Sequence, residues 1–396
     1  MMLQSIVLQN FRSYSKKTFA FSPTTTVIVG PNTAGKTNIL EAIAFLATGK
    51  SFRADQDREA IRWGEELARV RARISNFQFP ISNEEKDKEE LEIVITQGEV
   101  QGARASALTA VRRGWPMKKY LVNGVARRMV DFVGNLRAVL FWPEHLELVT
   151  DSPSIRRKYL DSVLVQVDRE YRRNLSSYER GLRQRNRLLD LINEGKAGRG
   201  QLLFWNQLLI KAGGYITQKR EEYIHFVNQY PMTLPRRQAG NAQYQIEYDK
   251  SVISESRLEQ YKDEEVGAKA TLVGPHRDDF IIAKYPIIQL SPAKRDLAPR
   301  DNNPNEANRS RELSKYGSRG EQRLAVLWMK LAELDYIEKE CGERPILLLD
   351  DIFSELDEGH RRLVVDLVGK QQTILTSADE ESIPKKIFES ATVIRL

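Results

Sequence analysis

The stretch VIVGPNTAGKTNILEAIAFL, residues 27–46, decides the fold of this chain. Its first three residues are apolar and β-branched, which predicts a buried strand, and apolar residues recur at helical spacing over its second half. The strand and the helix are joined by residues 30–37, Gly-Pro-Asn-Thr-Ala-Gly-Lys-Thr, a complete match to the phosphate-binding loop. An ordinary glycine turn is the alternative, but the strand before the match and the helix after it favour a nucleotide site.

This loop predicts how a nucleotide would be held. Backbone N–H groups of such a loop surround the phosphates, Lys36 supplies a cation for the β- and γ-phosphates, and the Thr37 hydroxyl can ligate Mg²⁺. We therefore expect ATP and Mg²⁺ as cofactors. The residues expected to bind ATP are Gly30, Pro31, Asn32, Thr33, Ala34, Gly35, Lys36, Thr37 and Asn38.

A second chemical signal is the apolar run 346–349, which ends in Asp350-Asp351. A buried strand that ends in two carboxylates is unfavourable unless cations or polar groups surround them. Beside a phosphate loop, Asp350 is expected in the Mg²⁺ shell with Thr37, and Asp351 is expected to polarise the attacking water as a general base. Lys36, Asp350 and Asp351 are thus the expected catalytic residues. A turn with two solvated aspartates is the alternative.

A third signal is KYGSRGEQRLAVLWMKLAEL, residues 315–334, in which a small polar tripeptide precedes an amphipathic helical pattern. The N-terminus of a helix offers N–H groups and a partial positive charge to an anion. The order of phosphate loop, serine-glycine helix start and acidic strand is that of ABC-type ATPases, whose signature helix caps the ATP held by a second subunit. A core helix with an ordinary N-cap is the alternative. The residues expected to act in trans are Ser318, Arg319, Gly320, Glu321 and Gln322.

Composition excludes several classes of protein. The single cysteine rules out a disulfide framework, and four scattered histidines give no zinc-site spacing. The first residues do not resemble a signal peptide, and no apolar run approaches the length of a membrane span. A net charge of +7 favours an acidic partner such as nucleic acid. We expect a cytoplasmic, nucleoid-associated protein.

Other patterns predict an α/β fold with a helical insertion. Alternating apolar residues predict a strand over 68–74, a short apolar run predicts another at 93–95, and Asn123-Gly124 predicts a hairpin turn. The pattern becomes helical and basic from about Asp151. We expect an ATPase head formed by 1–150 and 270–396, and a helical arm domain over 151–269.

After the helical segment, strand patterns return near Tyr244 and at 272–273, and the polar stretch 290–311 is expected to be a loop. The segment GPHRDDF invites comparison with a catalytic His-Asp pair. Its spacing places His276 and Asp278 on a strand after a Gly-Pro turn, which better suits a structural or interface role.

The start of the arm carries most of the excess positive charge. Residues 151–187 contain ten Lys or Arg and five Asp or Glu, a net of +5. Such a surface would neutralise DNA phosphates without reading bases, so we expect salt-sensitive binding with little sequence preference. A solvated basic helix face is the alternative. The residues expected to contact DNA are Arg156, Arg157, Lys158, Arg183 and Arg187.

Across nearly its whole length the chain resembles the RecF family of SMC-like DNA-repair ATPases of bacteria. The stretches that carry the resemblance are LQNFRSY, GPNTAGKTNILEAI, GKSFR, FWPEHLELVTDSPSIRRKYLD, YERGLRQRNRLL, TLVGPHRDDF, SRGEQRLAVLWMKLAEL and ILLLDDIFSELD, in the order of the family.

The resemblance implies an ABC/SMC-type head with two lobes and an inserted arm. It implies a homodimer that forms on ATP, clamps gapped or junctional single-/double-stranded DNA, and works with RecR- and RecO-type mediators to help load recombinase. It also places Ser354 and Asp357 in a loop facing the partner subunit, and Arg12 near the nucleotide. The implied setting is recombinational repair, replication restart and the SOS response to DNA damage.

The sequence departs from the general ABC pattern at several positions. Trp142 stands where a glutamine usually senses phosphate, Thr376 stands where a switch histidine is usual, and Arg319 replaces a signature glycine. Asp351 is shorter than the usual glutamate. These differences, most of which the RecF pattern shares, favour slow ATP hydrolysis. The resemblance implies that DNA stimulates it.

Four other classes fit less well. A transporter ATPase has a shorter distance between phosphate loop and signature, and a long-armed SMC protein needs extended heptads and a hinge or hook. A nuclease of the overcoming-lysogenization-defect type needs a further acidic domain, and a P-loop kinase leaves the signature unexplained. The alternative that stays open is an ABC-type ATPase subunit that acts with another partner complex rather than on DNA.

Overall fold

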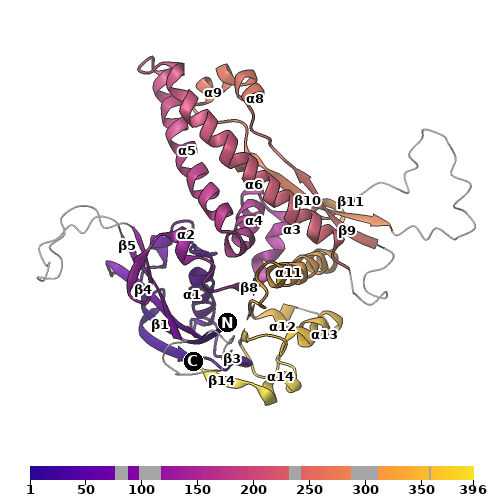
Figure 1. Ribbon diagram of the computed structural model, residues 1–396. Coiled ribbons are helices and arrows are strands. Elements are labelled where there is room, and N and C mark those ends of the chain that lie inside the picture. Colours follow the sequence, from indigo (N-terminus) through magenta and orange to yellow (C-terminus); the bar gives the residue numbers. More distant parts are fainter. Residues whose placement is uncertain (76–87, 98–116, 232–241, 287–310, 356–357) are drawn as a thin grey trace, which may run out of the picture. The chain divides into compact units, whose positions relative to one another are not determined.

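The computed structural model describes residues 1–75, 88–97, 117–231, 242–286, 311–355 and 358–396. The chain divides into two compact units (Figure 1). The second unit extends to Tyr336, whereas the arm was expected to end at residue 269. These units are groups of residues in close contact, and they do not test the expected head and arm ranges, which stay a prediction. The first unit comprises Met1–Pro143, Val165–Arg169 and Ile337–Leu396, and the second comprises Glu144–Leu164 and Glu170–Tyr336.

The first unit contains a parallel sheet that places the nucleotide motifs. Its described strands run in the order β14-β3-β13-β12-β8, and every adjacent pair is parallel. Strands β3, β12 and β13 are buried along their whole length, as expected for a sheet covered on both faces. The strands are β3 (Thr25–Val29), β8 (Ala138–Phe141), β12 (Ile346–Asp350), β13 (Thr373–Ser377) and β14 (Thr392–Arg395).

An antiparallel sheet forms the other layer of this unit, with the described strands in the order β2-β1-β4-β5-β6-β7. The predictions of a strand over 68–74, a strand at 93–95 and a hairpin at Asn123-Gly124 are confirmed. On β4 the alternating residues from Ala68 to Ile74 are buried. The strands are β1 (Met2–Phe11), β2 (Tyr14–Ala20), β4 (Leu67–Ser75), β5 (Lys88–Thr96), β6 (Lys118–Val122) and β7 (Val125–Arg127).

The helices of the first unit include the one that follows the phosphate loop. This helix, α1, buries an apolar face that includes Ile39, Leu40, Ile43 and Leu46, as predicted. The described helices are α1 (Lys36–Thr48), α2 (Met129–Phe132), α12 (Ile352–Glu355), α13 (Glu358–Leu367) and α14 (Lys385–Ser390), with a 3-10 turn, η1, at Asp57–Ala60.

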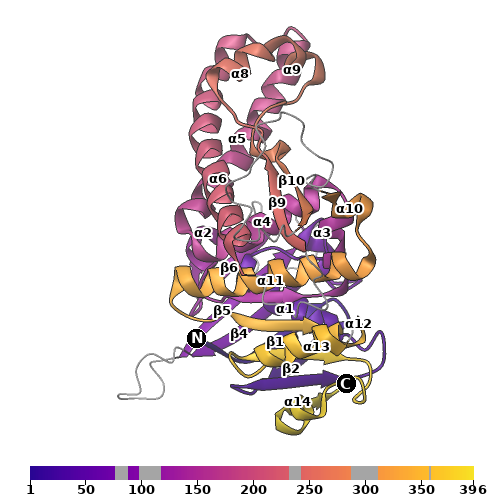
Figure 2. The same ribbon diagram turned by 90° about the vertical axis from the view of Figure 1, so that its right-hand side faces the viewer.

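The second unit is built on two long helices, α5 and α6, which lie side by side (Figure 2). A short sheet in the order β11-β10-β9 completes it. The helices are α3 (Glu147–Thr150), α4 (Pro153–Val167), α5 (Arg169–Asn193), α6 (Leu203–Gln229), α8 (Glu255–Gln260), α9 (Lys262–Ala268), α10 (Leu313–Tyr316) and α11 (Arg319–Cys341). The strands are β9 (Ala242–Asp249), β10 (Asp279–Pro286) and β11 (Arg311–Glu312), and 3-10 turns occur at Pro143–Leu146, Arg199–Leu202 and Pro275–Arg277.

The pattern near Tyr244 is confirmed as β9, but two other strand predictions are wrong. Residues 272 and 273 lie outside any strand, and His276 lies in a 3-10 turn that leads into β10. The Gly-Pro pair sets this turn, because proline is well suited to its first position. The expected loop 290–311 falls outside the described residues except for Arg311.

Candidate nucleotide-binding site

The phosphate loop leaves β3 and enters α1 with the backbone turned for anion binding. Thr33 and Gly35 have positive φ angles of 74° and 95°, and successive turns of this kind point N–H groups into a common hollow. The Lys36 ammonium donates to the carbonyl oxygens of Gly30 at 2.7 Å and Pro31 at 3.0 Å. The lysine thus lies over the loop, where a phosphate would replace these carbonyls as its acceptor.

The turn between β1 and β2 packs directly on this loop. A Cβ at Gly35 would lie 2.9 Å from the Ser13 hydroxyl oxygen and 2.8 Å from that of Tyr14, so only glycine fits. Tyr14 lies near the Gly35 carbonyl, at 3.2 Å, and burial raises the pKa of its phenol to about 12. The close backbone approach and the required glycine fit a loop that wraps phosphates.

A buried carboxylate on α1 connects this turn to the segment that follows the helix. Glu41 is fully buried and accepts two hydrogen bonds from Arg12, at 2.9 and 2.5 Å. It also accepts from the Ser51 hydroxyl at 2.6 Å, and Arg53 lies 3.7 Å away. Arg53 in turn donates to the Asn38 side chain at 2.9 Å. The structure therefore places Arg12 beside the phosphate-loop helix, and its place near a bound nucleotide stays a prediction.

The acidic pair lies at the same edge of the parallel sheet as the phosphate loop. Asp350 ends β12 and is buried, and its carboxylate accepts a hydrogen bond of 2.6 Å from the Thr376 hydroxyl on β13. Because β13 lies between β12 and β3, Asp350 is about 10 Å across the sheet from the end of β3. Asp351 has a positive φ of 47°, and its N–H points at Thr376.

Two neighbours of this edge were named from the sequence. Trp142, at the position of the usual glutamine, packs edge-on against Phe52 with ring centres 4.6 Å apart. Ser354 donates to the Asp351 carbonyl at 2.7 Å and is exposed. Asp357, the other residue expected in the partner-facing loop, lies outside the described residues.

The signature segment forms the start of α11 in the second unit. Ser318 is its N-cap: the serine hydroxyl oxygen accepts from the Glu321 N–H at 3.3 Å, and the Glu321 carboxylate accepts from the Ser318 N–H at 2.9 Å. This is a capping box. Gln322 donates to the Leu313 carbonyl at 2.9 Å, which ties the helix to α10. Lys284 and Ser318 together hold the pKa of Glu321 below its usual value.

Known proteins are similar to this chain over nearly its whole length. Residues 2–392 match the family model of the RecF/RecN/SMC N terminal domain. The DNA replication and repair protein RecF of Roseiflexus castenholzii is 33% identical over 419 residues, which cover 99% of this chain and 97% of that protein. The chain belongs to the RecF family. The RecF of Herpetosiphon aurantiacus is 34% identical over 406 residues, with 99% and 97% covered.

A solved structure described as the recombination mediator protein RecF with ATP, in the RecFOR pathway, gives a TM-score of 0.76 at 28% identity. It covers 96% of this chain and 93% of its own. The predicted fold class, an ABC/SMC-type ATPase head, is confirmed. As a RecF family member the chain is a DNA replication and repair protein of an ATP-binding ATPase family. The comparisons give no support to the alternative of a partner complex that does not act on DNA.

Among the described residues, no group of three or more His, Cys, Asp or Glu side chains is arranged to hold a metal ion. Mg²⁺ in nucleotide sites is usually held by one or two protein ligands together with phosphate oxygens and water, so Thr37 and Asp350 fit that role. None of the helices that the structure describes is long and apolar enough to cross a membrane.

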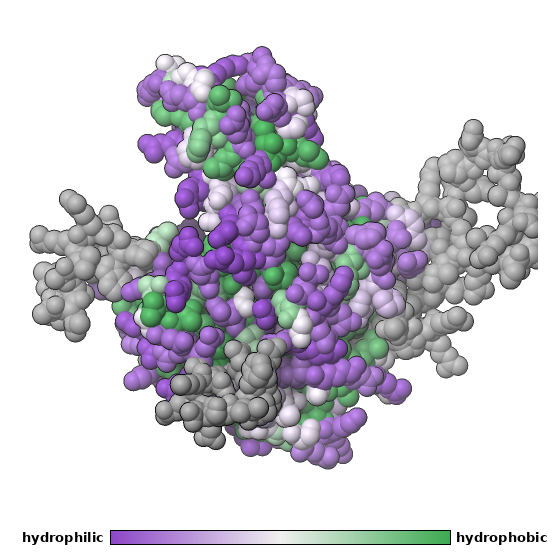
Figure 3. Space-filling model, in the orientation of Figure 1, coloured by the Kyte–Doolittle hydropathy of each residue, from purple (hydrophilic) through white to green (hydrophobic). Residues whose placement is uncertain are grey.

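The basic residues expected to contact DNA fall into two groups. Arg183 and Arg187 are exposed on α5, on the same face as Arg180. Figure 3 shows both hydrophilic and hydrophobic residues on this face of the second unit. Lys158 on α4 is also exposed.

The expectation of an exposed cation at Arg156 is wrong. This side chain is buried and donates to both carboxylate oxygens of Asp279, at 2.6 and 2.9 Å, and to the Asp151 carbonyl at 2.6 Å. Arg157 is half-buried and donates to the Asp278 carbonyl at 2.7 Å. The count of basic residues overestimated the positive charge on the surface, because α4 packs on β10 and Asp279, the first residue of β10, pairs with Arg156.

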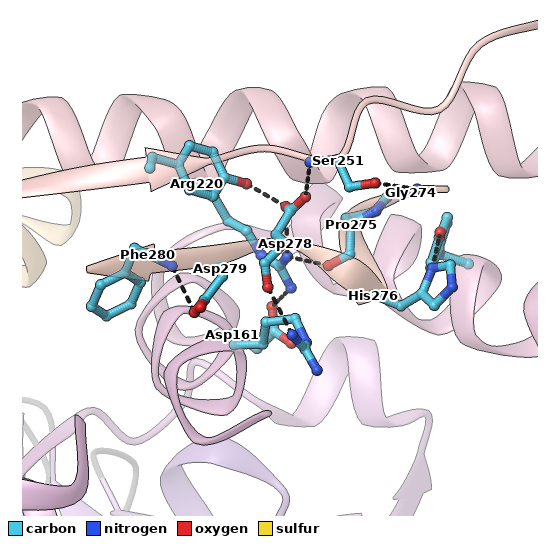
Figure 4. A network of polar contacts seen from close by, with 12 residues as sticks. Asp161, Arg220, Ser251, Gly274, Pro275, His276, Asp278, Asp279 and Phe280 are labelled. Atoms are coloured by element: carbon cyan, nitrogen blue, oxygen red, sulfur yellow. Dashed lines mark hydrogen bonds and ion pairs between the residues drawn. The ribbon is translucent and has the colours of Figure 1, made fainter. Parts of the chain in front are cut away.

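The segment GPHRDDF forms the polar centre of the second unit (Figure 4). Asp278 is fully buried and accepts from Arg220 at 3.0 Å, from the Ser251 N–H at 2.7 Å and from the Tyr248 hydroxyl. Arg220 also donates to Asp161, at 2.8 Å, and to the Pro275 carbonyl, at 2.7 Å. The structural role predicted for this segment is confirmed, because its acids hold helices α4 and α6 to β9 and β10.

His276 belongs to the same network and gives a pH-dependent prediction. Its ring nitrogens lie 2.8 Å from the Tyr178 hydroxyl oxygen and 2.9 Å from the Thr271 carbonyl oxygen, and burial lowers its pKa to about 4. Because the unfolded pKa is about 6.5, the stability from neutral His276 is present above that pH and is lost as pH falls toward about 4.

We expect the free energy of unfolding of the unaltered chain to fall, between pH 7.5 and pH 5, by about 2 kcal/mol more than that of His276→Gln. Urea unfolding at both pH values measures this difference. Equal losses in the two proteins would show that His276 is not held neutral.

Several residues of the site escaped the sequence analysis. Glu41 left one signal, a single acid within the otherwise apolar run ILEAIAFLA. Ser13 and Arg53 lie in stretches that carry the family resemblance, but their contacts could not be predicted because they depend on loops that meet only in the folded chain. Arg185 was counted as surface charge, but it is buried and donates to Glu265 at 2.6 Å.

Proposed function

We propose that the chain is an ATP-dependent DNA-binding protein of recombinational repair and replication restart, which dimerises on ATP to clamp gapped or junctional DNA and help load recombinase. The observation that carries the proposal is the shared edge of the parallel sheet. There the phosphate loop follows β3 and the buried Asp350 ends β12, with Thr376 of β13 between them. This arrangement supports binding and hydrolysis of a nucleoside triphosphate.

The proposed roles of the residues follow from their chemistry. The loop 30–37 with Asn38 holds the phosphates, and Lys36 neutralises the charge that develops on them. Thr37 and Asp350 hold Mg²⁺, which supplies further charge neutralisation when bound. Asp351 orients and polarises the attacking water. Its shorter side chain supports slow hydrolysis, which suits a clamp better than a motor.

The signature supplies the dimer. Ser318 and the N-terminus of α11 in one chain meet the γ-phosphate held by the other, with Arg319, Gly320, Glu321 and Gln322 as the rest of the signature. Ser354 and Asp357 face the partner chain. ATP therefore joins the two protomers, and its hydrolysis allows them to separate. Mediator proteins of the RecR and RecO type are proposed partners, because the neighbouring structure is described as part of the RecFOR pathway.

DNA binding is assigned to the exposed face of α5 with Lys158, which would place the protein on the nucleoid. Arg183→Glu/Arg187→Glu is expected to weaken binding to a gapped duplex. The slope of the logarithm of the binding constant against the logarithm of salt concentration, which is negative, should become less steep by about 2, because two phosphate contacts are lost. Fluorescence anisotropy across a salt series, in the presence of ATP, measures both quantities.

A matched control reverses the same amount of charge elsewhere. Lys385→Glu/Lys386→Glu changes two exposed residues on α14 and should leave the salt slope unchanged. Equal effects from the two double variants would mean that only net charge matters, and the assignment to α5 would fall. Unchanged binding by the α5 variant would move the DNA site elsewhere.

A further inference from the structure

The serine assigned to the partner's nucleotide already binds an anion of its own chain. The Glu321 carboxylate accepts hydrogen bonds from the Ser318 N–H at 2.9 Å and the Ser318 hydroxyl at 3.2 Å. The other oxygen of the same carboxylate is paired with Lys284, which comes from β10. A hydroxyl, an N–H and an ammonium from two separate elements thus surround one negative charge.

We propose that Glu321 is an internal competitor of the γ-phosphate, which occupies Ser318 until the ATP of a second chain displaces it. This inference rests on the proposed function of the signature and deepens it. Lys284 weakens this competition, because its positive charge partly neutralises the carboxylate that the incoming phosphate must displace.

The two anions exclude each other for a simple reason. The Ser318 hydroxyl and N–H carry one proton each, so a phosphate can use them only when the carboxylate has left. Both members of the Glu321–Lys284 pair are about one-third exposed, so water can solvate the carboxylate after release. Displacement needs the extra charge of a γ-phosphate, which ADP lacks. Glu321 therefore makes association of the chains depend on ATP rather than on any nucleotide.

The charge on Glu321 predicts opposite effects for two substitutions. Glu321→Gln keeps the capping box, because glutamine serves this position as well, but removes the competing charge. It should tighten ATP-dependent self-association about fivefold, the effect of one unit charge about 4 Å away at the dielectric constant of water, because both members of the pair are partly exposed. Lys284→Met leaves the carboxylate without its neutralising partner and should weaken association by a similar factor.

The experiment measures the dissociation constant of the self-associated chain by sedimentation equilibrium with the slowly hydrolysed analogue ATPγS, and again with ADP. Glu340→Gln is the control, because it removes the same charge from the exposed far end of α11 and should leave the constant unchanged. Thermal unfolding of each variant checks that the fold is kept.

The outcomes separate this inference from the function on which it rests. If Ser318→Ala abolishes association and Glu321→Gln tightens it, the competitor role stands. If Ser318→Ala abolishes association and Glu321→Gln leaves it unchanged or weaker, Glu321 is only a helix cap. If Ser318→Ala has no effect, the signature does not meet the partner's nucleotide, and both the proposed role and this inference are wrong.

Discussion

Replacing Lys36 with alanine is expected to lower the rate of ATP hydrolysis about 100-fold or more, because one preorganised positive charge is lost from the transition state. The structure already places this ammonium over the phosphate loop, on the carbonyls of Gly30 and Pro31. Steady-state release of phosphate, at saturating ATP and with gapped DNA present, measures the rate.

Lys370→Ala is the matched control, because it removes an exposed lysine from the same unit. Its hydrolysis rate should equal that of the unaltered chain. Thermal unfolding midpoints show whether either variant loses its fold. A folded Lys36→Ala protein that retains more than about a tenth of the original rate would contradict the assigned role of the loop.

Replacing Asp278 with alanine is expected to reduce the free energy of unfolding by about 3–5 kcal/mol, because it leaves the buried Arg220 short of a counter-charge. Asp278 also accepts from the Ser251 N–H and the Tyr248 hydroxyl, so the change removes several hydrogen bonds from the centre of the second unit. Urea unfolding followed by circular dichroism measures the loss.

Asp263→Ala provides the comparison for this substitution. Asp263 pairs with Arg199 on the surface of the same unit, where an ion pair contributes little to stability because water solvates both charges. Similar losses from the two variants would mean that the network around Asp278 is no more important to stability than a surface pair.

The nucleotide site could be predicted because its parts are local in the sequence. The phosphate loop needs a strand, a glycine turn and a helix within about 20 residues, and the acidic pair needs one buried strand with a polar end. Both patterns are visible in the chain without any tertiary contact. Their shared sheet edge follows because nucleotides bind at the carboxyl ends of parallel strands.

Residues that act through tertiary contacts could not be predicted in the same way. Arg156 and Arg183 look alike as basic residues of a helical segment, but one pairs with Asp279 and the other is exposed. The difference arises from a carboxylate more than a hundred residues later in the chain. In the same way, the hydrogen bonds from Arg12 to Glu41 could not be predicted, because they form only where the β1–β2 turn lies on α1 in the folded chain.

The most direct test of the account mixes two inactive variants, Lys36→Ala and Ser318→Ala, in equal amounts with ATP and gapped DNA. If the signature acts in trans, each mixed dimer has one site with an intact Lys36 from one chain and an intact Ser318 from the other. The hydrolysis rate per chain should then recover to about a quarter of the original if pairing is random, and to about a half if only mixed pairs associate. A mixture as inactive as its components would show that each chain completes its own site, and would contradict the account.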